Sequence, residues 1–296
     1  MIFIGYPHRQ RSVPFRVLLP NLLTTVALCS GMASIHFSLK AGAIKAPSPG
    51  IVSLDLDHRW EQAMLCILIA AIFDMLDGLT ARLLKVQSPF GAVLDSLSDF
   101  LSFGVAPAML LHQWTLSDCD IGPYRADALG LAAVMTFILC SALRLARFTA
   151  AARAVKPLPG APAPEPRPPN PLAHRFFTGM PTPAAAGAVL IPPMLAVAKF
   201  PHYETPDALV VPFTFLIALL MVGRQPMFSL KRIRIPRRMV VPLMIVLGLV
   251  VASAAKYPFL TAALLCGGYL LTTPISIISH RRLVGGARPG GPAHGP

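Results

Sequence analysis

Residues 74–99 read Asp74-x2-Asp77-Gly78-x2-Ala81-Arg82-x8-Gly91-x3-Asp95-x3-Asp99, and they set four carboxylates within an apolar part of the chain. The whole sequence holds 13 acidic residues, so this concentration is unusual. A carboxylate at the centre of a membrane costs about 2.5–3.5 kcal/mol on insertion scales, so four are tolerated only where something offsets their charge. A divalent cation with oxygen ligands does so, and the stretch therefore predicts a metal site within a membrane.

The remainder of the chain has the composition of a membrane protein. Its 296 residues are 54% hydrophobic and 13% charged, with a mean hydropathy of +0.62, whereas soluble domains carry about 25% charged residues. Because a helix needs about 20 apolar residues to cross a bilayer, we expect an all-α, polytopic helical bundle of about eight transmembrane helices. The expected spans are residues 19–39, 62–84, 91–113, 128–150, 180–198, 208–223, 239–255 and 258–279.

Basic residues are distributed unevenly along this predicted topology. The net charge is +13, and most of the 26 lysines and arginines fall on one side of the membrane if both termini lie on that side. Acidic residues outside 74–99 are concentrated on the opposite side. The positive-inside rule therefore predicts an even number of spans with both termini in the cytoplasm. The same distribution argues against a nucleic-acid partner.

The spacing of the aspartates assigns them to two helix faces. Asp74 and Asp77 are three positions apart, and Asp95 and Asp99 are four apart, so each pair projects from one face of its helix. A short turn containing Pro89 separates the two helices. If the helices pack antiparallel, all four carboxylates point into one pocket.

Residues beside the aspartates indicate a phosphate ligand. Gly78 and Ala81 have little or no side chain and leave room for a ligand near the backbone. Arg82 is a cation suited to phosphate oxygens. Two other interpretations are an ion-paired bundle, for which only Arg82 and Lys85 are near in sequence, and a cation transporter, which would need no nucleotide-sized space.

The full spacing resembles the signature of the CDP-alcohol phosphotransferases, integral membrane enzymes that displace CMP from a CDP-linked donor with an alcohol. Every fixed position of that signature is present, which makes it a specific motif. The resemblance implies two divalent ions, Mg²⁺ or Mn²⁺, with Asp74, Asp77 and Asp95 as ligands and Asp99 as both ligand and general base. Positions that contact the CDP-lipid or its nucleotide in the family correspond to Gly78, Arg82, Ser88, Asn21 and Thr24.

Three further stretches resemble the bacterial phosphatidylserine synthase branch of this family: residues 94–107, 144–148 and 177–184. This branch implies CDP-diacylglycerol and L-serine as substrates, a bacterial cytoplasmic (inner) membrane location with the active site facing the cytoplasm, and a homodimer. Arg144 or Arg147 would contact phosphate or the serine carboxylate. Thr149 stands where the branch usually has Asn, so glycerol 3-phosphate, inositol phosphate and choline stay open as acceptors.

The predicted domain organisation follows from the same resemblance. We expect a single membrane domain over residues 1–296, with the phosphotransferase core at 18–223 and two additional transmembrane helices at 239–279. Residues 157–171 are rich in proline and predict an extended cytoplasmic linker. The Gly/Pro-rich tail at 285–296 predicts disorder.

Overall fold

The computed structural model describes residues 15–44, 52–86, 88–116, 126–154, 176–198, 207–223, 226–228 and 237–285. The proline-rich segment 157–171 and residues 286–296 lie outside them, whereas Gly285 ends the last helix. The elements are α1 (Phe15–Ile44), α2 (Val52–Leu83), α3 (Pro89–Asp99), η1 (Phe100–Val105), α4 (Ala106–Leu111), η2 (His112–Leu116), α5 (Ala126–Ala154), β1 (Phe176–Thr178), α6 (Thr182–Val189), α7 (Ile191–Val197), α8 (Asp207–Val222), β2 (Pro226–Phe228), η4 (Arg237–Met239), α9 (Val240–Lys256) and α10 (Pro258–Gly285).

Four helical stretches are long and apolar enough to cross a membrane, and they match the first four predicted spans. The third stretch joins α3, η1, α4 and η2 into one continuous rod, in which η1 and η2 are π-helical. The last three predicted spans correspond to the shorter apolar helices Leu209–Val222, Val240–Lys256 and Pro258–Thr273. The protein is therefore a multi-pass helical membrane protein, and the count of eight and the cytoplasmic termini stay predictions.

The fifth predicted span, 180–198, is not one helix. It divides at Leu190 into α6 and α7. Pro192 and Pro193 follow the break, and each lacks an amide hydrogen and crowds the carbonyl four residues earlier. The two prolines therefore explain why the apolar run does not continue as a single helix.

The all-α prediction is confirmed for nearly all of the described residues, and one short two-stranded antiparallel ribbon accompanies the helices. β1 pairs with β2, with Phe176 opposite Phe228. Beyond β1, Gly179 has a left-handed φ of 80°, and the amide of Met180 donates to the carbonyl of Leu220 at 3.3 Å. The chain that precedes α6 is thus joined by its backbone to the end of α8.

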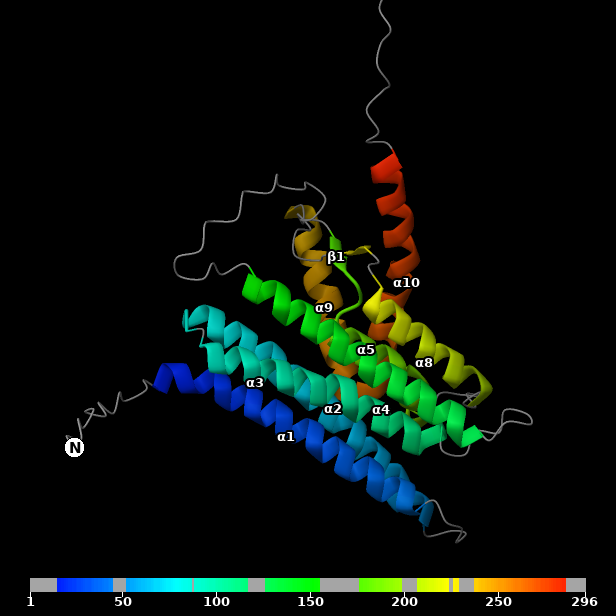
Figure 1. The fold of residues 1–296 in the computed structure, drawn as a ribbon. Helices are drawn as coiled ribbons and strands as arrows, with labels where there is room; N and C mark the ends of the chain where they lie inside the picture. The colour runs from blue at the N-terminus through cyan, green and yellow to red at the C-terminus, as the bar shows by residue number, and fades with distance from the viewer. Residues whose placement is uncertain are drawn as a thin grey trace, which may run out of the picture.

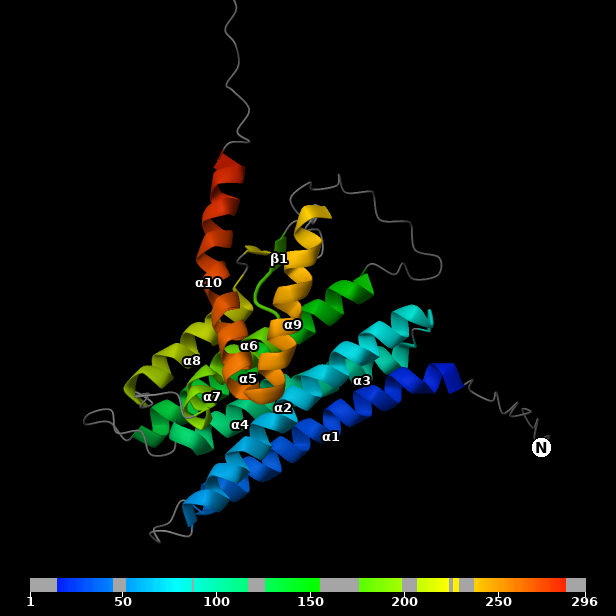
Figure 2. The same cartoon turned by 180° about the vertical axis from the view of Figure 1, so that it is seen from behind.

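The core lies where α2, η1, α4, α5, α6 and α8 meet. Figure 1 shows α1 to α5 and α8 extending in similar directions, with α9 and α10 crossing them steeply. From the opposite side, Figure 2 shows α10 over α6 and α7, against which it packs. None of the α9 side chains is buried by the described part of the chain, as suits an apolar helix in lipid. The largest fully buried side chains are Phe103, Phe137, Met64, Leu110, Leu111, Met180, Leu190, Met194, Ile217 and Met221.

Candidate active site

The turn between α2 and α3 reverses the chain between the two aspartate pairs. At the end of α2, Lys85 adopts the left-handed conformation (φ 53°), and the amide of Val86 donates to the carbonyl of Ala81 at 3.1 Å. This is the Schellman ending of a helix. α3 then begins at the N-cap Ser88, whose Oγ accepts a hydrogen bond from the amide of Gly91 at 2.9 Å. Local backbone signals therefore set where each helix stops and starts.

Three of the four aspartates converge. One oxygen from each of Asp74, Asp95 and Asp99 lies within 4.8 Å of the other two, and Asp77 is within electrostatic range of this cluster. Buried oxygens of Asp77 (Oδ2) and Asp99 (Oδ1) have no hydrogen-bond partner among the described residues. Among the described residues, no lysine or arginine forms a salt bridge with any of the four carboxylates. Buried oxygens without partners match the hard-oxygen ligand set of Mg²⁺ or Mn²⁺, so the residues fit the expected metal.

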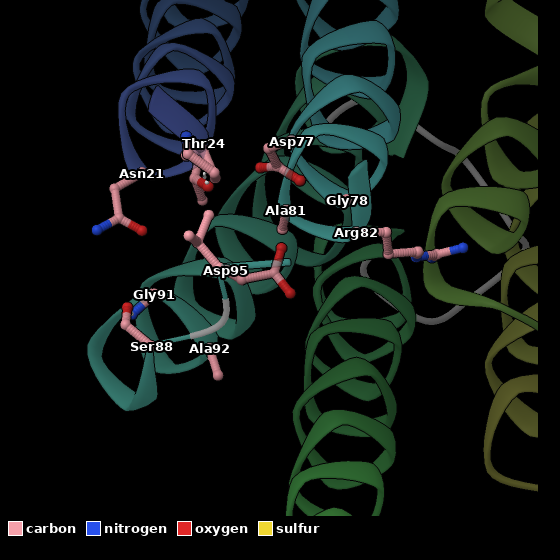
Figure 3. Close-up of a pocket in the computed structure, with 12 residues that line it drawn as sticks. Asn21, Thr24, Asp77, Gly78, Ala81, Arg82, Ser88, Gly91, Ala92 and Asp95 are labelled. Carbon is pink, nitrogen blue, oxygen red and sulfur yellow. Dashed lines mark hydrogen bonds between the residues drawn. The ribbon is translucent and has the colours of Figure 1, made fainter. Parts of the chain in front are cut away.

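A cavity of about 260 Å³ opens beside the aspartates, between α1, α2 and α3. Figure 3 shows Asn21 and Thr24 facing it from α1, and Asp77 and Asp95 pointing into the space between the helices. The side chain of Arg82 extends away from these two carboxylates (Figure 3). The structure thus brings the five residues predicted from the family's donor positions to one cavity: Asn21, Thr24, Gly78, Arg82 and Ser88. We call it the donor cavity.

Two glycines of this cavity have different surroundings. A Cβ at Gly78 would have one described neighbour, Nη2 of Arg82 at 3.8 Å, so this face of α2 is open to a ligand. A Cβ at Gly91 would lie 2.6 Å from Oδ1 of Asn21 and 3.0 Å from Oγ of Ser88. A side chain at Gly91 would therefore displace the amide of Asn21 and the hydroxyl of Ser88 from the positions they hold at the cavity.

The two predicted arginines lie outside the donor cavity. Arg144 is partly buried, within electrostatic range of Asp99, and its Nη1 donates to Oγ1 of Thr182 at 2.6 Å. Arg147 is exposed, and its Nη1 donates to the carbonyl of Val222 at 3.2 Å. Both line a second cavity of about 310 Å³ between α5 and the end of α8. We call it the acceptor-side cavity, and neither arginine lines the donor cavity.

Sequence reasoning missed the residues that hold the Asp99 segment. Ser98 Oγ donates to the carbonyl of Thr24 at 3.2 Å, and Ser102 Oγ donates to the carbonyl of Ala27 at 3.1 Å. Asp99 lies between these serines, at the start of the π-helix η1, and π-helical turns occur often at functional sites. The two serines are four residues apart and therefore lie on one face of the helix. Small residues on one face let membrane helices approach closely, so this spacing was a signal in the sequence.

The sequence matches the family model for CDP-alcohol phosphatidyltransferase over residues 17–200. The chain belongs to this family. The match covers both aspartate pairs, the donor cavity and the two arginines, so the family identification and the site geometry concern the same residues. Membership also argues against the transporter interpretation, because the family is one of transferases.

Several relatives of known name cover most of the chain. A CDP-diacylglycerol--serine O-phosphatidyltransferase from Mycobacterium bovis is 31% identical over 95% of this chain and 85% of its own length. A protein of the same name from Helicobacter pylori strain 26695 is 28% identical over 79% of this chain and 81% of its length. A third, from Bacillus subtilis, is 32% identical over 50% of this chain and 80% of its length.

Proposed function

We propose that this protein transfers the phosphatidyl group of CDP-diacylglycerol to L-serine, forming phosphatidylserine and CMP. The observation that carries the proposal is the carboxylate cluster of Asp74, Asp95 and Asp99 beside the donor cavity. Asp95 lines the donor cavity, and Asp99 is within electrostatic range of Arg144, which lines the acceptor-side cavity. Group transfer requires donor and acceptor to meet in a fixed orientation, and this arrangement supports such a meeting at Asp99.

We assign the donor cavity to the nucleotide and pyrophosphate of CDP-diacylglycerol. Asn21 and Thr24 offer polar groups from α1, and Ser88 offers a hydroxyl from the start of α3. Gly78 leaves the surface of α2 open, so phosphate oxygens can approach it closely. Arg82 is exposed at the edge of the cavity and can turn its guanidinium toward a bound phosphate.

We assign Asp74, Asp77, Asp95 and Asp99 as the residues that hold two divalent ions, Mg²⁺ or Mn²⁺. The oxygens without partners at Asp77 and Asp99 support this assignment. When bound, such ions neutralise charge on the pyrophosphate and on the departing CMP. The carboxylates in turn fix where the donor phosphates lie relative to Asp99.

On the acceptor side, we assign Asp99 as the base that takes the proton of the serine hydroxyl. The hydroxyl oxygen then forms a bond to the phosphorus that carries diacylglycerol, and the bond from that phosphorus to the CMP phosphate oxygen breaks. Arg144 forms charge-assisted hydrogen bonds with the serine carboxylate. Serine itself rests on the names of the relatives. The charge pattern of the sequence supports a reaction at the cytoplasmic face of the membrane, and the bacterial relatives support an inner-membrane location.

The test is turnover by the purified protein in mixed micelles of detergent and CDP-diacylglycerol with Mg²⁺ or Mn²⁺. CMP release and the lipid product are measured with serine, glycerol 3-phosphate, inositol phosphate and choline in parallel. We expect product with serine alone, loss of activity with EDTA and recovery when the metal is restored. Turnover with another alcohol and background release with serine would overturn the acceptor assignment.

A further inference from the structure

We propose that Thr182, the first residue of α6, is a positioning residue that holds the guanidinium of Arg144 in the orientation that binds the acceptor. The proposal rests on the proposed function, because that function assigns Arg144 to the acceptor. Thr182 lines neither the donor cavity nor the acceptor-side cavity. It therefore acts through the arginine and does not touch a substrate itself.

The contact between the two side chains is direct. Nη1 of Arg144 donates to Oγ1 of Thr182 at 2.6 Å, a short distance that is typical of a charged donor. Thr182 is only 1% exposed, so water has little access to this hydrogen bond. Among the described residues, Nε of Arg144 is buried and has no partner. The guanidinium is thus held at one nitrogen, and its other donors are available to a carboxylate.

The orientation of the guanidinium decides how well it binds such a ligand. A guanidinium is planar, and it recognises a carboxylate with two parallel hydrogen bonds. A rotation of the plane would misalign at least one of them. Because a threonine hydroxyl accepts hydrogen bonds and a guanidinium only donates them, Thr182 can restrain this rotation without competing for the ligand.

The chain around Thr182 is stiff, which suits it to hold another side chain in place. A proline flanks it on each side, with φ fixed by the ring, and the β-branched threonine has a restricted χ1. Two residues earlier, the amide of Met180 donates to the carbonyl of Leu220 at 3.3 Å. Residues 221–223, which follow this carbonyl, line the acceptor-side cavity. The hydroxyl that contacts Arg144 and one wall of the cavity therefore belong to connected backbone segments.

The stability of α6 does not explain the position of Arg144. Thr182 begins this helix, and the N-terminus of a helix carries partial positive charge that disfavours a nearby cation. Arg144 therefore adds positive charge where the backbone is already positive. A carboxylate bound to Arg144 reduces this unfavourable charge, which agrees with a role in ligand binding.

The first test is Thr182→Val, which removes the hydroxyl and nearly keeps the shape of the side chain. We expect kcat/KM for serine to fall about 3- to 30-fold, the effect of losing one hydrogen bond to a charged group, mainly through KM. The KM for CDP-diacylglycerol should not change. Thr214→Val is the matched control, because Thr214 is equally buried and its hydroxyl donates to a backbone carbonyl within α8. It should leave both KM values unchanged.

Two further variants test the hydroxyl itself. Thr182→Ser keeps the hydroxyl and should restore serine kinetics close to those of the wild type, whereas Thr182→Cys has a weak acceptor and should be impaired. This pair decides the question even if Thr182→Val does not fold. The proposal is overturned if the serine and cysteine variants have equal kinetics, or if the KM values for both substrates rise together.

A double-mutant cycle separates positioning from a general structural effect. If Thr182 acts through Arg144, Thr182→Val should have no further effect in an Arg144→Ala background. Equal losses in both backgrounds would show that the hydroxyl acts elsewhere and would overturn the proposal. If the wild-type protein uses another alcohol, the serine part of the proposed function fails separately, and the same cycle with that alcohol decides the role of Thr182.

Discussion

Asp99 differs from the other aspartates because it alone among them is within electrostatic range of Arg144. It also shares a potential metal site with Asp74 and Asp95. We expect Asp99→Asn to abolish turnover while largely preserving CDP-diacylglycerol binding, because three donor-side carboxylates remain. CMP release and binding of the lipid are measured in parallel, with Glu61→Gln as a remote control. Near-wild-type CMP release with serine would remove Asp99 from the role of base.

Gly78 offers a way to separate binding from stability. Alanine in place of a helical glycine favours the helix by about 0.5–1 kcal/mol, and the nearest described atom to the added Cβ is 3.8 Å away. We therefore expect Gly78→Ala to melt no lower than the wild type, yet to raise the KM for CDP-diacylglycerol about 10-fold, because the methyl group occupies ligand space. Gly248→Ala is the control, because a Cβ at this helical glycine would meet no described atom within 4 Å; it should gain similar helix stability and leave the KM for CDP-diacylglycerol unchanged. An unchanged KM in Gly78→Ala would mean that the donor does not contact this face.

The two arginines are predicted to differ although they lie one turn apart. Arg144 is partly buried beside Asp99, whereas Arg147 is exposed and bonded to a backbone carbonyl. Loss of charge-assisted hydrogen bonds worth about 1.5–3 kcal/mol corresponds to a roughly 10- to 150-fold higher KM for serine in Arg144→Ala. Arg147→Ala is the matched control and should have a much smaller effect. If the KM for CDP-diacylglycerol rises equally in Arg144→Ala, this arginine serves the donor phosphates instead.

At the scale of elements, the segment that follows β1 packs against the end of α8, where residues 221–223 line the acceptor-side cavity. Gly179 has φ 80°, and a Cβ there would lie 2.9 Å from the carbonyl oxygens of Met221 and Gly223. We expect Gly179→Ala to destabilise the protein by about 1–3 kcal/mol, since an L side chain is strained in this conformation, and to raise the KM for serine more than that for CDP-diacylglycerol. Thermal unfolding in detergent and steady-state kinetics measure the two effects. Gly267→Ala, a helical glycine without neighbours, is the control, and a Gly179→Ala protein as stable as this control would contradict the account.

The α2–α3 turn and the donor cavity were predictable because their information is local. Three- and four-residue spacings fix which aspartates share a helix face. Pro89, which we expected in the turn, is instead the first residue of α3. Pro192 and Pro193 also indicate the break between α6 and α7. The continuous apolar run around them led us to expect a single helix instead. The β1–β2 ribbon was not predictable, because its strands are three residues each and lie far apart in the chain.

At the scale of the whole molecule, the packing of α10 against α6 and α7 could not be predicted from periodicity. Membrane helices such as α5 and α10 are apolar on most sides, so no polar face indicates which side packs inward. α10 packs against α6 and α7, which lie far from it in the sequence. This docking supports our proposal that the core at 18–223 and the helices at 239–279 form one membrane domain rather than two.

The orientation of the molecule in its membrane gives the last prediction. The charge pattern places Cys119 on the outside and the basic segment 224–238 inside. The remaining cysteines lie within apolar helices: Cys29, Cys66, Cys140 and Cys266.

An impermeant maleimide should therefore label Cys119 in intact right-side-out spheroplasts. A cysteine introduced as Ser229→Cys in a Cys119→Ser background should react only after the membrane is permeabilised. Cys119→Ser alone gives the background. The topology would be inverted if sealed spheroplasts labelled the Ser229→Cys protein and failed to label Cys119 of the wild-type protein. The Asp99 site would then lie at the outer face, where cytoplasmic CDP-diacylglycerol and serine could not reach it.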